Sequence, residues 1–255
     1  MTRPLTRTNF NSSKLIRILT DLSMLEAAES GSAFAEKLGL WVGFADAITL
    51  CSAQSPTSER AQSGVPTISK SAVGEEFARV RANLVQSIIQ STATKGVRTR
   101  IARPSPKPGM SVEDAIAYGP YRRYHLAHQR DMELSVRPLR VKLREALSVA
   151  SPALKQLAAI DSAFDGILSD RESKLFSTLP SLLEKRFAQL LAAHQQSPLD
   201  ARKADTPDVW MKPGGWLARF CAELETVLLA ELDVRLQPAV GLMEALNNEI
   251  ENKNE

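Results

Sequence analysis

The residues best suited to chemistry lie together in the middle of the chain. All three tyrosines and two of the three histidines fall within residues 118–130, which read YGPYRRYHLAHQR. On a helix, four of these rings would share one face: Tyr121, Tyr124, His125 and His128. Arg122 and Arg123 would flank that face. Because aromatic rings stack on bases and guanidinium groups bind phosphates, the pattern predicts a nucleic-acid-binding helix.

The charge around this segment favours the same function. Residues 93–145 hold 12 Lys and Arg against 5 Asp and Glu, although the whole chain carries a net charge of only +3. The predicted contacts to DNA or RNA are Tyr121, Arg122, Arg123, Tyr124, His125, Arg130, Arg137 and Arg140. The alternative is a ring face that packs in the core, with the arginines solvated or paired to acids elsewhere.

The same segment raises two chemical hypotheses. His125, His128 and Asp131 recur every three residues, a spacing that would place metal ligands along one helical edge. No second ligand pair accompanies them, so no metal site is predicted. Arg123 and His128 form an Arg-x4-His arrangement that resembles the short motif of HEPN-type ribonucleases, which are all-α proteins. That resemblance implies a histidine acting on the ribose 2′-hydroxyl and an arginine steadying charge on the phosphate.

Other signatures of enzymes are missing from the sequence. It contains no P-loop, dinucleotide-binding, nucleophile-elbow or zincin motif, so a non-enzymatic protein without a cofactor is expected. Cys51 and Cys221 predict neither a disulfide framework nor a thiolate metal site. No apolar run approaches the roughly 18 residues that a membrane span needs, and no secretory signal is seen. These features predict a cytoplasmic protein that is not inserted in a membrane.

The C-terminal part of the chain suggests a second kind of function. Residues 221–255 carry 8 acidic against 2 basic side chains. An apolar stripe at helical spacing begins with Leu217, Phe220 and Leu224. An acidic helix with such a stripe would dock another protein, which makes a helical adaptor the alternative to a nucleic-acid-binding protein. Long paired helices also favour self-association, so a homo-oligomer is expected.

The elements that must position these residues are helices. Apolar residues recur at three- and four-residue intervals nearly throughout, and no segment alternates as a strand does. The expected fold is an all-α helical bundle with long antiparallel helices, kinked by prolines such as Pro138 and Pro180. The segment RPSPKP is expected to be an extended linker. It separates an N-terminal helical region, residues 1–102, from a long-helix bundle, residues 111–255, with residues 103–110 between them.

Several short motifs resemble a known group of sequences. They are RTNF at residues 7–10, FAEKLGLW at 34–41, DAITL at 46–50, RPLR at 137–140, SPALKQLA at 151–158 and LPSLLEKRF at 179–187. Together they resemble an uncharacterised family of proteobacterial helical proteins, typically encoded beside a MotA/ExbB-like membrane motor protein and an OmpA/MotB-like peptidoglycan-binding protein. That gene set resembles a Zorya-type antiphage defence system. The resemblance implies a cytoplasmic accessory protein that works with this membrane motor complex against phage, and it assigns no catalytic residue.

Overall fold

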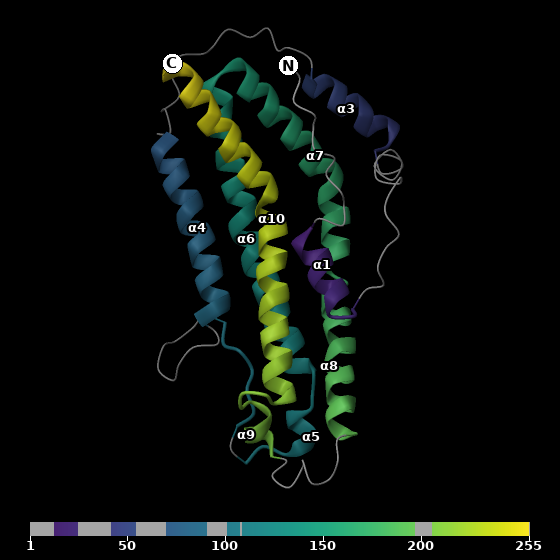
Figure 1. Ribbon diagram of the computed structural model, residues 1–255. Coiled ribbons are helices and arrows are strands. Elements are labelled where there is room, and N and C mark those ends of the chain that lie inside the picture. Colours follow the sequence, from purple (N-terminus) through teal and green to yellow (C-terminus); the bar gives the residue numbers. More distant parts are fainter. Residues whose placement is uncertain are drawn as a thin grey trace, which may run out of the picture. The chain divides into compact units, whose positions relative to one another are not determined.

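The structure, a computed structural model, describes residues 13–24, 42–54, 70–90, 101–107, 109–196 and 206–254. The regular elements in these ranges are all helices, which confirms the predicted all-α class (Figure 1). They are α1 (Lys14–Asp21), α3 (Phe44–Gln54), α4 (Lys70–Gln90), α5 (Val112–Ala115), α6 (Gly119–Ala150), α7 (Pro152–Phe176), α8 (Leu179–Gln195), α9 (Pro207–Trp210) and α10 (Trp216–Asn254). The motifs at residues 7–10 and 34–41 lie outside the described ranges. Within those ranges, no helix has the length and apolar character that crossing a membrane requires.

The chain divides into two compact units that are discontinuous in sequence. Unit 1 comprises residues 1–31, 84–131 and 177–234, and unit 2 comprises residues 32–83, 132–176 and 235–255. The long helices α6 and α10 each contribute one part to each unit. Residues 101–107 are non-helical, in keeping with their proline content, but the division between the units does not follow this segment.

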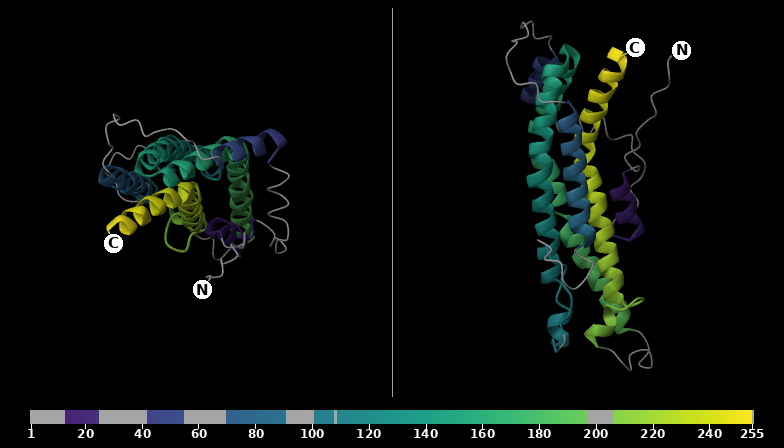
Figure 2. Two further views of the ribbon diagram at one scale, coloured as in Figure 1. Left: turned by 90° about the horizontal axis from the view of Figure 1, so that it is seen from above. Right: turned by 90° about the vertical axis from the view of Figure 1, so that its left-hand side faces the viewer.

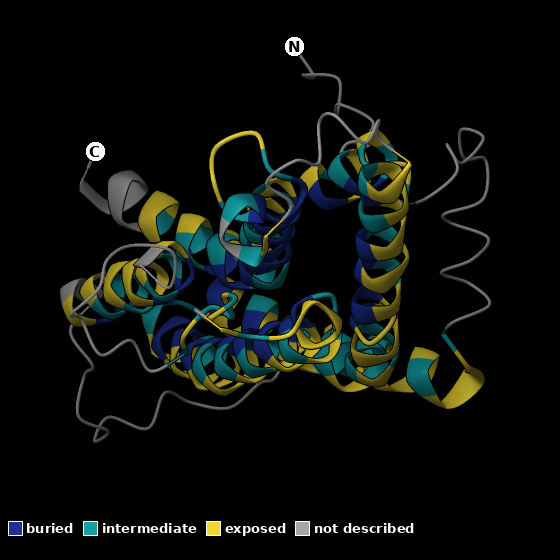
Figure 3. Cartoon of the chain, turned by 90° about the horizontal axis from the view of Figure 1, so that it is seen from below, coloured by how far each residue is buried: buried dark blue, intermediate teal, exposed yellow. Residues whose placement is uncertain are grey.

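Unit 1 is built around the first part of α6, α8 and the first part of α10. Helix α8 runs antiparallel to the other two (Figures 1 and 2). Their facing sides are apolar, and the fully buried side chains include Leu183, Leu217, Phe220 and Leu224. Figure 3 shows this pattern as buried stripes on the inner faces of the helices and exposed residues on the outer faces. The 3.6-residue period of the apolar positions therefore determines which side of each helix is covered.

A tight turn sets the start of α10 and holds two tryptophans together. Gly214 adopts a φ of +88°, and a Cβ atom at Gly215 would collide with the carbonyl oxygen of Trp210. Glycine is needed at both positions, because other residues are strained at positive φ or have no room for a side chain. The turn brings the rings of Trp210 and Trp216 to a centroid distance of 5.5 Å.

Unit 2 contains α3, α7 and the remaining parts of α4, α6 and α10. Helix α6 passes into α7 at Ser151, and the two helices run antiparallel (Figure 1). Helix α3 packs against α7. The predicted proline inside a long helix is found at Pro138 of α6, and Pro238 lies in the same way within α10. The buried residues of α6 in this unit include Leu139, Leu143 and Leu147.

Candidate nucleic-acid interface

The first turns of α6 separate aromatic rings from arginines. Gly119 and Pro120 begin the helix, where the missing N–H of proline costs no helical hydrogen bond. The ring face forms as expected: Tyr121, Tyr124, His125 and His128 are 3%, 5%, 0% and 2% exposed. The predicted exposure of this face is wrong, because the whole face packs into the interior of unit 1. The rings proposed for base stacking, Tyr121, Tyr124 and His125, are therefore not accessible to a nucleic acid.

The tyrosines belong to an aromatic cluster supplied by α6, α8 and α10. The Tyr121 ring meets Phe220 edge-on, with centroids 5.4 Å apart, and Phe187 lies 5.0 Å from Phe220. The Tyr118 hydroxyl donates a hydrogen bond of 2.7 Å to the carbonyl oxygen of Pro180. Burial raises the pKa of Tyr121, so its phenol stays protonated at neutral pH. Packing within the core thus accounts for these tyrosines.

His125 forms a fully buried pair with Glu231 of α10. Its Nε2 atom lies 3.2 Å from Oε2 of Glu231, and both side chains are 0% exposed. The side-chain amide of Gln129 donates to the other carboxylate oxygen at 2.9 Å. A buried carboxylate is costly unless it is paired, so these contacts explain how Glu231 is accommodated on an otherwise apolar side of α10.

His128 is placed in a position that does not suit catalysis. Its ring lies edge-on to Tyr124 at 4.6 Å between centroids. Burial, reinforced by the nearby His125, lowers the pKa of His128 to about 4, so it is neutral at pH 7. Arg123 is exposed and five residues earlier, about 140° around the helix. Arg123 thus lies on the solvent side of α6 and His128 in the interior of unit 1, and the ribonuclease hypothesis stays a prediction.

The histidines also lack the surroundings of a metal centre. In the ranges that the structure describes, no group of three or more His, Cys, Asp or Glu side chains is placed to hold a metal ion. The regular spacing of His125, His128 and Asp131 consequently does not produce a ligand set. His125 is directed to Glu231 instead.

Opposite the rings, α6 presents three exposed arginines, Arg122, Arg123 and Arg130, which we call the arginine face. At about 100° per residue they occupy a sector of roughly 100°. Leu126 lies between them on the same side and is 41% exposed. None of the three arginines forms an ion pair with another residue in the described part of the chain. Their charges are therefore available to a partner.

Arg140, another predicted nucleic-acid contact, is held inside unit 2. Its Nη2 lies 2.7 Å from Oδ1 of Asp161 and its Nη1 lies 2.8 Å from Oδ1 of Asp165. Arg144 binds the remaining oxygens of the same two carboxylates at 2.6 and 2.7 Å. Burial alone would raise the pKa of Asp161, but the hydrogen bonds from both arginines lower it below its ordinary value. The prediction for Arg140 is wrong because its guanidinium group is already occupied by carboxylates.

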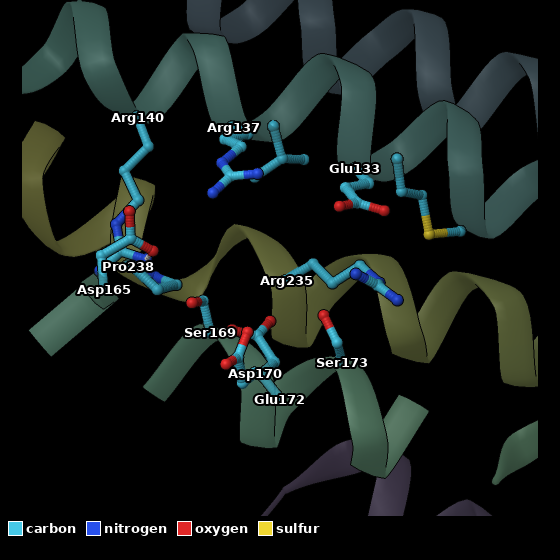
Figure 4. Close-up of a pocket in the computed structure, with 12 residues that line it drawn as sticks. Glu133, Arg137, Arg140, Asp165, Ser169, Asp170, Glu172, Ser173, Arg235 and Pro238 are labelled. Carbon is cyan, nitrogen blue, oxygen red and sulfur yellow. Dashed lines mark hydrogen bonds and ion pairs between the residues drawn. The ribbon is translucent and has the colours of Figure 1, made fainter. Parts of the chain in front are cut away.

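Arg137 is exposed and lies at a polar cavity of about 210 Å³ in unit 2. Figure 4 shows Glu133 and Arg137 from α6 and Arg235 from α10 on its walls, opposite the α7 side chains Ser169, Asp170, Glu172 and Ser173. The guanidinium of Arg235 lies 3.9 Å from the centroid of the Phe176 ring. Burial raises the pKa of Glu172, although Arg235 acts in the opposite direction. The lining mixes carboxylates, guanidinium groups and serine hydroxyls, so the cavity is polar and carries both signs of charge.

Comparison with known proteins gives the chain a family. Residues 1–248 match the family described as "Protein of unknown function (DUF3348)". The chain belongs to this family. No curated protein and no solved structure gives a significant match.

The first part of the acidic C-terminal helix of this DUF3348 protein packs inside unit 1. The predicted docking stripe is buried, with Leu217 and Phe220 both 0% exposed. Glu223 accepts two hydrogen bonds from Arg186 of α8 at 2.7 and 2.8 Å. Asp233 pairs with Lys14 of α1 at 3.1 Å. The apolar stripe expected to dock an adaptor's partner is thus covered by the chain itself, whereas Glu244, farther along the acidic helix, is exposed.

The sequence analysis did not identify two sets of acidic residues that pair with the predicted site residues. Asp161 and Asp165 are spaced four residues apart, as are Arg140 and Arg144 on the preceding helix. Matching i, i+4 pairs of opposite charge on two consecutive antiparallel helices are a usable signal for such a network. The sequence gives a weaker indication that Glu231 is buried and paired. The indication is its position among leucines, which marks it as an acid on an apolar helix face.

Proposed function

We propose that this protein is a non-enzymatic helical protein that binds the phosphate backbone of nucleic acid through the arginine face. The observation that carries the proposal is the exposure of Arg122, Arg123 and Arg130 on one side of α6 without ion-pair partners in the described structure. Guanidinium groups bind phosphate oxygens in a fork geometry and stay charged at all physiological pH values. Three of them on a rigid helix form an anion-binding strip.

Further cations in unit 1 support this assignment. Lys107 is exposed and Arg103 is half-buried in the non-helical segment that precedes α6. The charge of Arg103 acts on Tyr121, against the larger effect of burial, so it lies near the base of the same helix. Because the aromatic rings are buried, the proposed contacts are to phosphates and not to bases. Binding should accordingly show little sequence preference.

The wider role that we propose follows from the sequence resemblance. It is that of a cytoplasmic accessory protein in a motor-linked, Zorya-type antiphage defence system, in which the arginine face engages phage nucleic acid. Other components of such a system, including the membrane motor complex, are then the proposed protein partners. The DUF3348 match is compatible with this role and supplies no activity of its own.

The test is fluorescence anisotropy of labelled double- and single-stranded DNA at several salt concentrations. The variant is Arg122→Gln/Arg123→Gln/Arg130→Gln. The matched control, Lys155→Gln/Lys185→Gln/Lys212→Gln, removes three positive charges from exposed positions elsewhere. Each lost phosphate contact should reduce the slope of log K against log salt by about 0.9, so the arginine variant should lose roughly 2 to 3 units of slope.

The expected affinity loss at low salt is at least about tenfold for the arginine variant and much less for the control. Equal losses in both variants would mean that only net charge matters, and the arginine face would not be the binding site. Absence of wild-type binding at low salt would reject nucleic acid as the ligand. Pull-down with acidic peptides would then ask whether the same arginines dock a protein.

A further inference from the structure

The polar cavity of unit 2 has the size of a site for a small metabolite. Its volume is about 210 Å³, whereas drug-sized ligands occupy cavities of roughly 300–1,000 Å³. Since a cavity of about 150 Å³ can hold benzene, this one would hold a ligand of about eight to ten non-hydrogen atoms. Its walls come from the parts of α6, α7 and α10 that belong to unit 2 (Figure 4). The cavity is therefore separate from the arginine face of unit 1.

Several charged groups on these walls have no partner within the described ranges. Glu133 and Arg137 are spaced for an i, i+4 ion pair on α6, yet neither forms an ion pair or hydrogen bond with a described residue. The same holds for Asp170 and Glu172 of α7. Glu172 is half-buried, and burial of a carboxylate without a partner is costly. A ligand that pairs with these groups would offset that cost.

Two other charged pairs on the walls are already satisfied or oriented by neighbours. Arg140 and Asp165 bind each other at 2.8 Å, within the network that joins α6 to α7. Arg235 places its guanidinium 3.9 Å from the centroid of the Phe176 ring. Neither contact provides a partner for the four groups without one.

The charge balance of the remaining lining is negative. Three carboxylates, those of Glu133, Asp170 and Glu172, stand against two guanidinium groups, those of Arg137 and Arg235. The carboxylates are thus in excess by one. A complementary ligand carries a net positive charge, and it also carries an anionic group for Arg137.

The lining has an apolar part as well. Met132 and Val136 of α6 are 1% and 8% exposed, and they precede Glu133 and Arg137 directly in the sequence. Apolar side chains of this kind favour contact with methylene groups over contact with water. The ligand should therefore have a hydrocarbon segment in addition to its charged groups.

We propose that the cavity binds a free basic amino acid of the length of ornithine or lysine. Arg137 binds the α-carboxylate with its two-pronged guanidinium, and Glu133, one helical turn earlier, binds the α-ammonium. The methylene groups of the ligand cover Met132 and Val136. The terminal ammonium pairs with Glu172 on the opposite, α7 wall (Figure 4). The single net positive charge of such a ligand matches the single excess carboxylate of the lining.

Two relatives of lysine each lack one half of the proposed contacts. Cadaverine is lysine without the α-carboxylate, so it has no group for Arg137. L-Norleucine keeps the α-carboxylate and α-ammonium but has no terminal ammonium for Glu172. Loss of one charged hydrogen bond should weaken binding about tenfold or more.

The experiment is isothermal titration calorimetry of the full chain with L-lysine, L-ornithine, cadaverine and L-norleucine. L-Lysine or L-ornithine should bind with a Kd of about 100 μM or less, and the other two compounds about tenfold or more weakly. Arg137→Gln should weaken L-lysine about tenfold and leave cadaverine within about threefold of the wild type. Glu172→Gln should weaken L-lysine and cadaverine about tenfold and leave L-norleucine within about threefold.

Matched controls remove one exposed charge of each sign elsewhere in unit 2. Lys155→Gln on α7 and Glu244→Gln on α10 should leave the affinity for L-lysine unchanged. An equal loss in these controls would place the ligand outside the cavity or reduce the effect to net charge, and would contradict the proposal.

The wild type alone can also overturn the proposal. Absence of binding by both L-lysine and L-ornithine at up to about 10 mM would reject a basic amino acid as the ligand. L-Norleucine that binds as tightly as L-lysine would exclude Glu172 as the partner of the terminal ammonium. Cadaverine that binds as tightly would exclude Arg137 as the partner of the carboxylate. These comparisons need no variant, so they are decisive even where a substitution lowers the melting temperature.

Discussion

The two parts of α6 use arginine in opposite ways. In unit 2, Arg140 and Arg144 are 14% and 15% exposed and share two aspartates of α7. In unit 1, the arginine face is exposed and lacks ion-pair partners among the described residues. The residue type is the same in the two parts. Whether a guanidinium is structural or available depends on which side of the helix a neighbouring element covers.

The comparison also shows why the count of basic residues in the sequence overestimates the number of arginines that are available to bind nucleic acid. Of the arginines predicted to contact nucleic acid, Arg140 stabilises the packing of α6 against α7, and Arg137 lies beside carboxylates at the unit 2 cavity. Arg122, Arg123 and Arg130 remain for binding. Partly buried arginine–carboxylate networks contribute to stability. Exposed arginines contribute little to stability and are available to bind a ligand.

The largest expected effect is loss of the paired arginines. Arg140→Ala/Arg144→Ala leaves Asp161 and Asp165 half-buried without cations, and should lower the free energy of unfolding by about 3 kcal/mol in urea titrations followed by circular dichroism. Adding Asp161→Asn and Asp165→Asn removes the orphaned charges and should recover part of the loss. A loss below about 1 kcal/mol would show that the network is not structural.

Acidification should reduce the stability that His128 of the ring face contributes, and it should not change the charge of the arginine face. The folded-state pKa of His128 is about 4, below its ordinary value of 6.5, so the unfolded chain takes up the proton first. The contribution of His128 to the free energy of unfolding is therefore fully present above pH 6.5. It should fall by up to about 3 kcal/mol as the pH decreases to 4.

Urea titrations of the wild type and His128→Gln at several pH values isolate this contribution. The difference in unfolding free energy between the two proteins should shrink as the pH falls from 6.5 to 4. A constant difference would mean that His128 does not titrate in this range. DNA affinity should stay constant between pH 8 and 6.5, because arginine remains charged throughout.

A smaller effect is expected for a single paired arginine in unit 1. Arg186 binds both oxygens of Glu223 and is 12% exposed. Arg186→Lys cannot reproduce the two-pronged contact and should lower the unfolding free energy by about 1 kcal/mol. Arg219 touches the same carboxylate but is 64% exposed, so Arg219→Lys is a matched control with an expected change below about 0.5 kcal/mol. Equal effects would remove burial as the explanation.

The smallest effect on stability is expected for the arginine face itself. Arg122→Gln/Arg123→Gln/Arg130→Gln should change the unfolding free energy by less than about 0.5 kcal/mol, because exposed side chains without partners contribute little. Thermal melts and urea titrations provide the measurement. A larger loss would show that these arginines stabilise the fold, and the contrast between the two parts of α6 would disappear.

The sequence alone predicted the helices well because their signals are local. The apolar period in α6, α8 and α10, the prolines inside and at the starts of helices, and the lack of strand-like alternation all act within a few turns. The shared face of Tyr121, Tyr124, His125 and His128 also followed from spacing. The bounds of the compact units did not, because α6 and α10 run through both units and only three-dimensional contacts divide them.

The sequence by itself thus determined the all-α class, the helical period and the faces on which side chains gather. Only the tertiary structure decided which of those faces is covered. A stripe of rings is compatible with a binding surface or a core, and Phe187 and Phe220, distant in sequence, place it in the core. In the same way Asp161, Asp165 and Glu231 occupy groups that looked available. Burial and charge pairing depend on contacts between distant segments, which no local spacing encodes.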